Sequence, residues 1–144
     1  MNAFRRSLAA AATVADLEEV VQGAIGSSGL MEFVRFDLGE VLRKEPSGQA
    51  PRILRLVVGN PLIMKEMVKT VPDAASYAPI TILVDERADG VHLSYDPISS
   101  LIAPYGGGPA LAVAADLDAK IESLLETAAS EAARRDRRLP QDAE

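Results

Sequence analysis

The chain has 144 residues, a net charge of −6 and no cysteine, so it has the length of one domain and needs no disulfide to bury a core. The missing cysteines exclude thiol nucleophiles and zinc–thiolate sites, and the acidic balance disfavours binding to nucleic acid or to anionic lipid. No run reaches the ~20 apolar residues of a membrane span, and the alanine-rich start is a poor signal peptide, so we expect a cytoplasmic protein.

The first third of the chain predicts a strand, a helix and a second strand. Residues 3–8 have the composition of an edge strand, although their alternation is poor. Thr13 and Asp16 have the spacing of a capping box, and a helix follows as far as Gly26. From Leu30 to Leu38 the hydrophobic period changes to two, which predicts a strand. The apolar face of the helix consists of Val14, Leu17, Val20, Val21, Ala24 and Ile25.

The stretch from Arg52 to Pro72 is the clearest structural signal in the sequence. Ile53 to Val58 is a nearly continuous apolar run rich in β-branched residues, which we expect to form the central strand of the sheet. Asn60 then offers a side-chain oxygen to a helix N-terminus, and Pro61 suits the first helical position. We favour this structural role for the pair over the alternative, an anion site at the same helix start.

The next segment predicts two paired strands and a short helix. Pro72 to Pro79 has the composition of a loop, and Ile80–Asp85 and Val91–Tyr95 have that of strands. The Asp89–Gly90 pair between them is the strongest hairpin signal in the chain. Asp96 and Pro97 repeat the pattern of Asn60 and Pro61, so we expect Asp96 to cap a short helix that ends near Ile102.

The last segment predicts a glycine-rich loop, a long helix and a tail. Pro104 to Pro109 contains three consecutive glycines and is expected to be a flexible loop. The helix begins at Leu111 or Asp116 and ends at Ala133, with a core stripe of Leu117, Ile121, Leu124, Leu125 and Ala128. Residues 134–144 carry mixed charge and few apolar side chains, so we expect one domain over residues 1–133 and a disordered tail.

This order of elements predicts an α+β fold, with an antiparallel sheet of four to five strands and helices packed on one face. The block from Arg52 to Pro97 also resembles the family catalogued as domain of unknown function 302, and the resemblance extends loosely over residues 13–128. The matching features, in order, are Gly59-Asn60-Pro61, the helix closing at Pro72, Pro79 before a hydrophobic strand, Asp89-Gly90 and Asp96-Pro97.

That resemblance implies a small bacterial β-α-β(4)-α domain, similar in outline to the TATA-binding-protein-like folds. It also implies a homodimer. It brings no catalytic residue, substrate or cofactor with it, so the cofactor stays unknown. Similarity in fold outline does not imply DNA binding, because a fold does not determine a function and this chain is acidic.

The single histidine, His92, is a weak catalytic candidate that shares a strand face with Ser94 and Asp96. Alternate residues of a strand lie roughly 6.5–7 Å apart with parallel side chains, so these three cannot form the relay of a catalytic triad. A surface histidine is the simpler interpretation. With one histidine and no cysteine, only the carboxylates of residues 85–89 could bind a metal, and they lack calcium-loop spacing, so we predict no metal site.

Two functions stay open at this point. The first is a homodimeric ligand-binding or protein-interaction module, with a groove near the sheet and the glycine-rich loop for a small apolar or anionic molecule. The alternative is an enzyme of unknown reaction that uses His92 with Asp96 and Asn60 in a cleft. The candidate binding residues are Asn60, Pro61, His92, Asp96, Tyr105 and Gly106.

Overall fold

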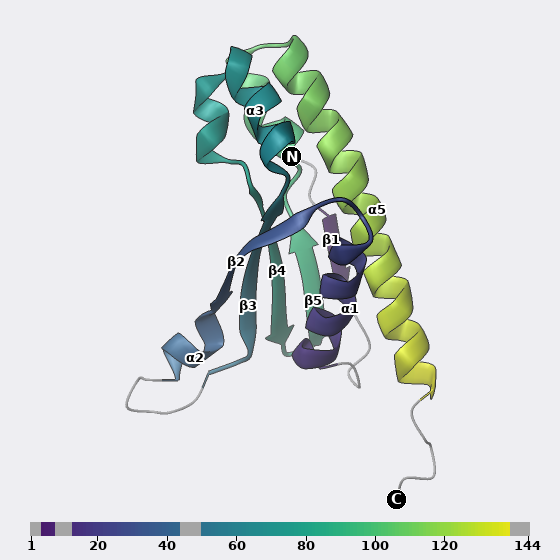
Figure 1. Ribbon diagram of the computed structural model, residues 1–144. Coiled ribbons are helices and arrows are strands. Elements are labelled where there is room, and N and C mark those ends of the chain that lie inside the picture. Colours follow the sequence, from purple (N-terminus) through teal and green to yellow (C-terminus); the bar gives the residue numbers. More distant parts are fainter. Residues whose placement is uncertain (1–3, 8–12, 44–49, 139–144) are drawn as a thin grey trace, which may run out of the picture.

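A computed structural model describes residues 4–7, 13–43 and 50–138 (Figure 1). The expected order β-α-β(4)-α is confirmed, with short helical segments inserted between the main elements. In chain order the elements are β1 (Phe4–Ser7), α1 (Val14–Gly26), β2 (Met31–Asp37), α2 (Leu38–Leu42), β3 (Ile53–Gly59), α3 (Pro61–Thr70), the 3₁₀ helix η1 (Pro72–Ser76), β4 (Ile80–Arg87), β5 (Gly90–Tyr95), α4 (Ile98–Ile102), the 3₁₀ helix η2 (Ala103–Tyr105) and α5 (Pro109–Arg138).

The sheet has five strands in the order β1-β5-β4-β3-β2, and each pair of neighbours is antiparallel. The edge strand expected near the N-terminus is confirmed as β1, which places Phe4 opposite Tyr95 of β5. The apolar run of β3 lies inside the sheet, but β4 rather than β3 occupies its centre. The expectation that Ile53–Val58 forms the central strand is therefore wrong, because this strand is the neighbour of the central one.

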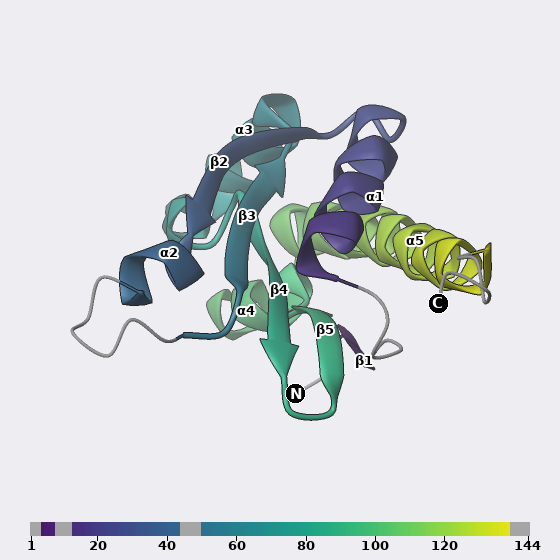
Figure 2. The ribbon, with the colours of Figure 1, turned by 90° about the horizontal axis from the view of Figure 1, so that it is seen from below.

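One face of the sheet packs against α1 and α5, as the sequence predicts (Figure 2). Alternate residues of β3, β4 and β5 point to this face because side chains alternate along a strand. The predicted apolar stripes of α1 and α5 meet them in one hydrophobic core. The buried apolar strand residues on this face are Leu54, Leu56, Val58, Ile80, Ile82, Val84, Val91, Leu93 and Tyr95.

The opposite face of the sheet is open, because α1 and α5 both lie on the other side (Figure 2). The side chains of β3 and β4 that point to this open face are half-buried or exposed. Arg55, in the middle of β3, is one of the exposed side chains. The strand register brings Val34 and Phe36 of β2 to the same face, where they are 41% and 42% exposed.

The helix starts predicted at Thr13 and Asn60 are confirmed. The Thr13 hydroxyl accepts from the N–H of Asp16 at 3.0 Å. Asn60 Oδ1 accepts from the N–H groups of Leu62 and Ile63, at 2.8 and 3.3 Å. Asn60 Nδ2 also donates to the carbonyl of Gly29 at 3.1 Å, which ties the start of α3 to the turn before β2.

Two expected loops are shorter than predicted. The loop expected at Pro72–Pro79 contains η1, and the flexible loop expected at Pro104–Pro109 is reduced to residues 106–108. A proline stands in the first turn of each helical segment concerned, and α5 begins on Pro109 rather than on Leu111 or Asp116. Proline at a helix start loses a donor that has no partner there, so these prolines begin helices rather than extend loops.

The helix end expected at Ala133 is also wrong, because α5 continues to Arg138. Arg134 binds Glu131 within the helix, and Arg135 Nη1 lies 2.8 Å from Glu19 Oε1 on α1. Arginine also favours the negative end of the helix dipole, so these side chains stabilise the added turns. The rest of the expected tail, residues 139–144, lies outside the described residues.

The short helix α4 is not capped by Asp96, so that expectation is wrong. Pro97 occupies the cap position, and it has no side-chain oxygen to offer. The cap comes instead from Asp118 on α5, which accepts from the N–H of Ile98 at 2.8 Å and from that of Ser99 at 3.0 Å.

Asp118 is a buried carboxylate, 7% exposed, and it also accepts a hydrogen bond from the hydroxyl of Tyr95. Burial and this hydrogen bond raise the pKa of Tyr95 above its usual value. One carboxylate thus joins α5, the end of β5 and the start of α4.

Replacing Leu56 by alanine is expected to destabilise the fold by about 2–5 kcal/mol, because Leu56 is fully buried and the change leaves a cavity. Chemical denaturation at one fixed protein concentration measures this cost. Leu62→Ala is the matched control, since Leu62 is 73% exposed and should cost less than about 0.5 kcal/mol. An equally small cost for Leu56→Ala would contradict the placement of β3 in the core.

Asp118→Asn is expected to lower the free energy of unfolding by about 1–3 kcal/mol. The amide offers one acceptor oxygen, so at least one of the three donors around it loses its partner. Asp116→Asn on the exposed side of α5 is the matched control and should change stability by less than about 0.5 kcal/mol. Equal denaturation midpoints for the two variants would show that the buried cap has no energetic role.

Candidate functional site

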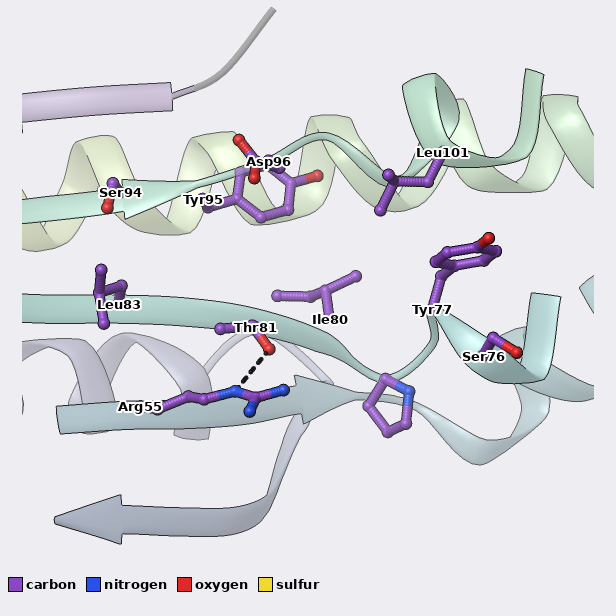
Figure 3. A pocket seen from close by; sticks show the side chains of 11 residues that line it. Arg55, Ser76, Tyr77, Ile80, Thr81, Leu83, Ser94, Tyr95, Asp96 and Leu101 are labelled. Carbon is purple, nitrogen blue, oxygen red and sulfur yellow. Dashed lines mark hydrogen bonds between the residues drawn. The ribbon is translucent and has the colours of Figure 1, made fainter. Parts of the chain in front are cut away.

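A pocket of about 350 Å³ lies on the open face of the sheet, where β3, β4 and β5 meet η1 and α4 (Figure 3). Its volume is at the lower end of the range of roughly 300–1,000 Å³ that is typical of ligand sites. Strands supply its floor, and the two short helical segments supply its far wall. The residues that line it are Arg55, Ser76, Tyr77, Pro79, Ile80, Thr81, Leu83, Ser94, Tyr95, Asp96 and Leu101.

Arg55 is the cation of this pocket. Its Nε donates to Thr81 Oγ1 at 3.2 Å, and its guanidinium carbon lies 5.6 Å from the centroid of the Phe36 ring. The register places Phe36 and Leu83 directly opposite Arg55 on the two neighbouring strands. Within the described part of the chain no carboxylate forms an ion pair with Arg55. Its terminal nitrogens point along β3 toward the end of the pocket that holds Tyr77 and Ser76 (Figure 3).

Ser94 contributes a buried polar group without a partner. The residue is 1% exposed, and its Oγ has no hydrogen bond within the described structure. A buried hydroxyl left in this state costs about 1–3 kcal/mol, so it calls for a physical explanation. Because Ser94 lines the pocket, a bound molecule with a polar group would supply the missing partner.

The far wall of the pocket depends on contacts with other elements. Tyr77 of the η1–β4 connection hydrogen-bonds through its hydroxyl to that of Tyr105 at 2.9 Å, and the ring centroids are 6.1 Å apart. This hydrogen bond raises the pKa of Tyr105. Leu101 belongs to α4, whose position is fixed by the Asp118 cap. The core helix α5 therefore determines where this wall stands.

The structure brings together only part of the predicted site. Asp96 lines the pocket, and Tyr105 adjoins it through Tyr77. Gly106 follows with a φ of 110°, and the space that a Cβ would occupy there is open. His92 lies on the same face of β5 but nearer the hairpin, with its Nε2 2.6 Å from Asp89 Oδ1. This contact lowers the pKa of Asp89.

The remaining predicted residues, Asn60 and Pro61, form the start of α3. The contacts of Asn60 are those of a helix cap, and Pro61 stands in the first turn. The register places His92 opposite Asp85, while Asn60 lies beyond the residue paired with Ile80. At about 3.4 Å per residue, the distance along β4 between those two levels is roughly 17 Å. His92 and Asn60 therefore do not share a cleft.

Sequence reasoning missed two groups that shape the pocket. Arg55 is the one charged residue inside the run Ile53–Val58, and this interruption was a usable signal for a polar group on the second face of the strand. Asp118 left no such signal, because it caps a helix that lies twenty residues earlier in the chain. In the sequence Ser94 stands out only as a neighbour of His92 and Asp96 on one strand face.

Among the described residues no cluster of histidine, aspartate and glutamate side chains has the arrangement needed to hold a metal ion. In the same part of the chain, none of the helices combines the length and the hydrophobicity of a membrane span.

Comparison with known proteins places this geometry in a family. The model of a family described as "Domain of unknown function DUF302" matches residues 6–128. A crystal structure of an uncharacterized conserved DUF302 protein from Bacillus stearothermophilus superposes with a TM-score of 0.79 at 13% sequence identity, over 89% of this chain and 98% of that one. A search of curated proteins gave no significant match. Because the family model spans most of the sequence, the chain belongs to the DUF302 family.

Proposed function

We propose that the protein is a homodimeric binding module that holds a small molecule in the pocket on the open face of the sheet. The observation that carries this proposal is the Ser94 hydroxyl, which is buried in the pocket wall and has no partner in the described structure. Native proteins satisfy most buried polar groups, and a ligand is a physical reason for leaving one unsatisfied.

The composition of the pocket supports the same proposal. Ligand sites combine apolar walls with a few polar groups that converge on them. Here Leu83, Leu101 and Pro79 supply apolar surface, and Arg55 and Thr81 supply hydrogen-bonding groups. The walls come from separate elements of the fold that the core holds in place, so the pocket is preformed.

The surface of β2 supports the homodimer. This strand is an edge of the sheet, and its backbone can pair with a second copy. Met31, Val34 and Phe36 of the same strand are 48%, 41% and 42% exposed. A two-fold contact between β2 strands would cover these apolar side chains and remove an exposed edge from each copy. We therefore assign the dimer contact to β2.

Blocking the pocket tests the binding site. We expect compounds from a fragment library that bind the wild type in ligand-observed NMR to lose binding to Leu83→Trp, because the larger ring fills the pocket floor. Leu62→Trp, with the same change on the exposed side of α3, should bind them like the wild type. Thermal unfolding confirms that both variants are folded. Hits that bind Leu83→Trp as well as the wild type would rule out this pocket.

The oligomeric state is tested separately by light scattering at micromolar concentration. We expect a species of twice the chain mass of 15.3 kDa. Phe36→Glu should shift it to the single-chain mass, because a charge in a paired apolar surface is costly. Leu62→Glu is the control and should remain dimeric. A wild type that scatters as a 15.3 kDa particle would contradict the homodimer.

A further inference from the structure

We infer that the ligand of this pocket is a small carboxylate with an apolar body and a hydrogen-bonding group at its far end. Arg55 and Thr81 hold the carboxylate, Leu83 contacts the body, and Ser94 meets the second polar group. This inference rests on the proposed function, since it names the ligand class of the same pocket.

The guanidinium of Arg55 is positioned to bind a planar anion. Its Nε is occupied by Thr81, which leaves the two terminal nitrogens with no described partner. The contact with the Phe36 ring holds the plane of the group on the open face. A guanidinium presents parallel N–H donors that match the two oxygens of a carboxylate. Thr81 Oγ1 accepts from Arg55 and keeps its own O–H to donate to the same anion.

The register separates the two polar groups that the ligand would meet. Arg55, Leu83 and Ser94 stand opposite one another on β3, β4 and β5. Neighbouring strands are about 4.8 Å apart, so the backbone positions of Arg55 and Ser94 are separated by roughly 10 Å. Leu83 lies between them and offers only apolar surface. A molecule that satisfies both ends therefore has an apolar middle and a polar group on each side.

Charge favours a carboxylate over a phosphate. Among the described residues that line the pocket, Arg55 is the one cation, and the lining includes the carboxylate of Asp96. The start of α4 adjoins the pocket, but Asp118 already accepts from its N–H groups, so they cannot cradle a phosphate. One guanidinium balances the single charge of a carboxylate better than the charge of nearly two on a phosphate.

The test uses four probes in NMR titrations: phenylacetate, phenylacetamide, 4-hydroxyphenylacetate and phenyl phosphate. We expect the wild type to bind phenylacetate at least about tenfold more tightly than the neutral amide, as a charge-assisted hydrogen bond implies. Arg55→Gln should abolish this preference. Arg35→Gln is the matched control, because Arg35 pairs with Glu18 on the side of the sheet that faces α1. It should keep the preference.

Ser94 is tested with the hydroxylated probe. We expect 4-hydroxyphenylacetate to bind the wild type about threefold to tenfold more tightly than phenylacetate, through a neutral hydrogen bond. Ser94→Ala should lose this gain but keep the preference for the carboxylate over the amide. Thermal unfolding checks that each variant is folded.

Three results would overturn the inference: equal affinity of the wild type for phenylacetate and phenylacetamide, tighter binding of phenyl phosphate than of phenylacetate, or an unchanged carboxylate preference in Arg55→Gln. The proposed function and the ligand class can fail separately. If neutral fragments bind the wild type but not Leu83→Trp, the pocket is confirmed as a binding site. If phenylacetate does not bind in that case, the carboxylate assignment is wrong. If neither the probes nor the library bind the wild type, both proposals fail.

Discussion

The alternation of side chains across β3, β4 and β5 is the constraint on which the rest of this molecule depends. Nine apolar side chains of these strands are buried on one face, and each contributes roughly 1.5–3 kcal/mol by leaving water. A slip of one residue in the pairing would send this whole set to the open face, so the register is fixed. The positions of Arg55, Thr81 and Ser94 follow from that register, because they are the alternate residues of the same strands.

The Asp118 carboxylate connects the hydrophobic core to the wall of the pocket, because it joins α5 to the start of α4. A charge buried in a protein is costly unless hydrogen bonds compensate it, and here three donors from the end of β5 and the start of α4 do so. One of those donors is the hydroxyl of Tyr95. Because α4 is too short to be a stable helix alone, its position and that of Leu101 depend on α5.

Local signals in the sequence were enough for most of the fold. The apolar run of β3, the Asn60–Pro61 helix start and the Asp89–Gly90 hairpin each act within a few residues, and the structure confirms all three. The wrong cap assignment arises because a distant group competes with a local one. Asp96 has the local pattern of a cap, but Asp118 takes that role from across the fold. The pocket likewise combines side chains from segments far apart in the sequence, and a pattern along one strand cannot show such a combination.

The two faces of β5 differ in how their polar groups are hydrogen-bonded. On the core face Leu93 and Tyr95 are buried, and the hydroxyl of Tyr95 donates a hydrogen bond to Asp118. On the other face Ser94 is buried as deeply, but its hydroxyl has no partner among the described residues. Alanine at this position would fit the same space without the cost of an unpaired hydroxyl. The serine would have a physical rationale if a group outside the described structure, such as the proposed ligand, completed its hydrogen bonding.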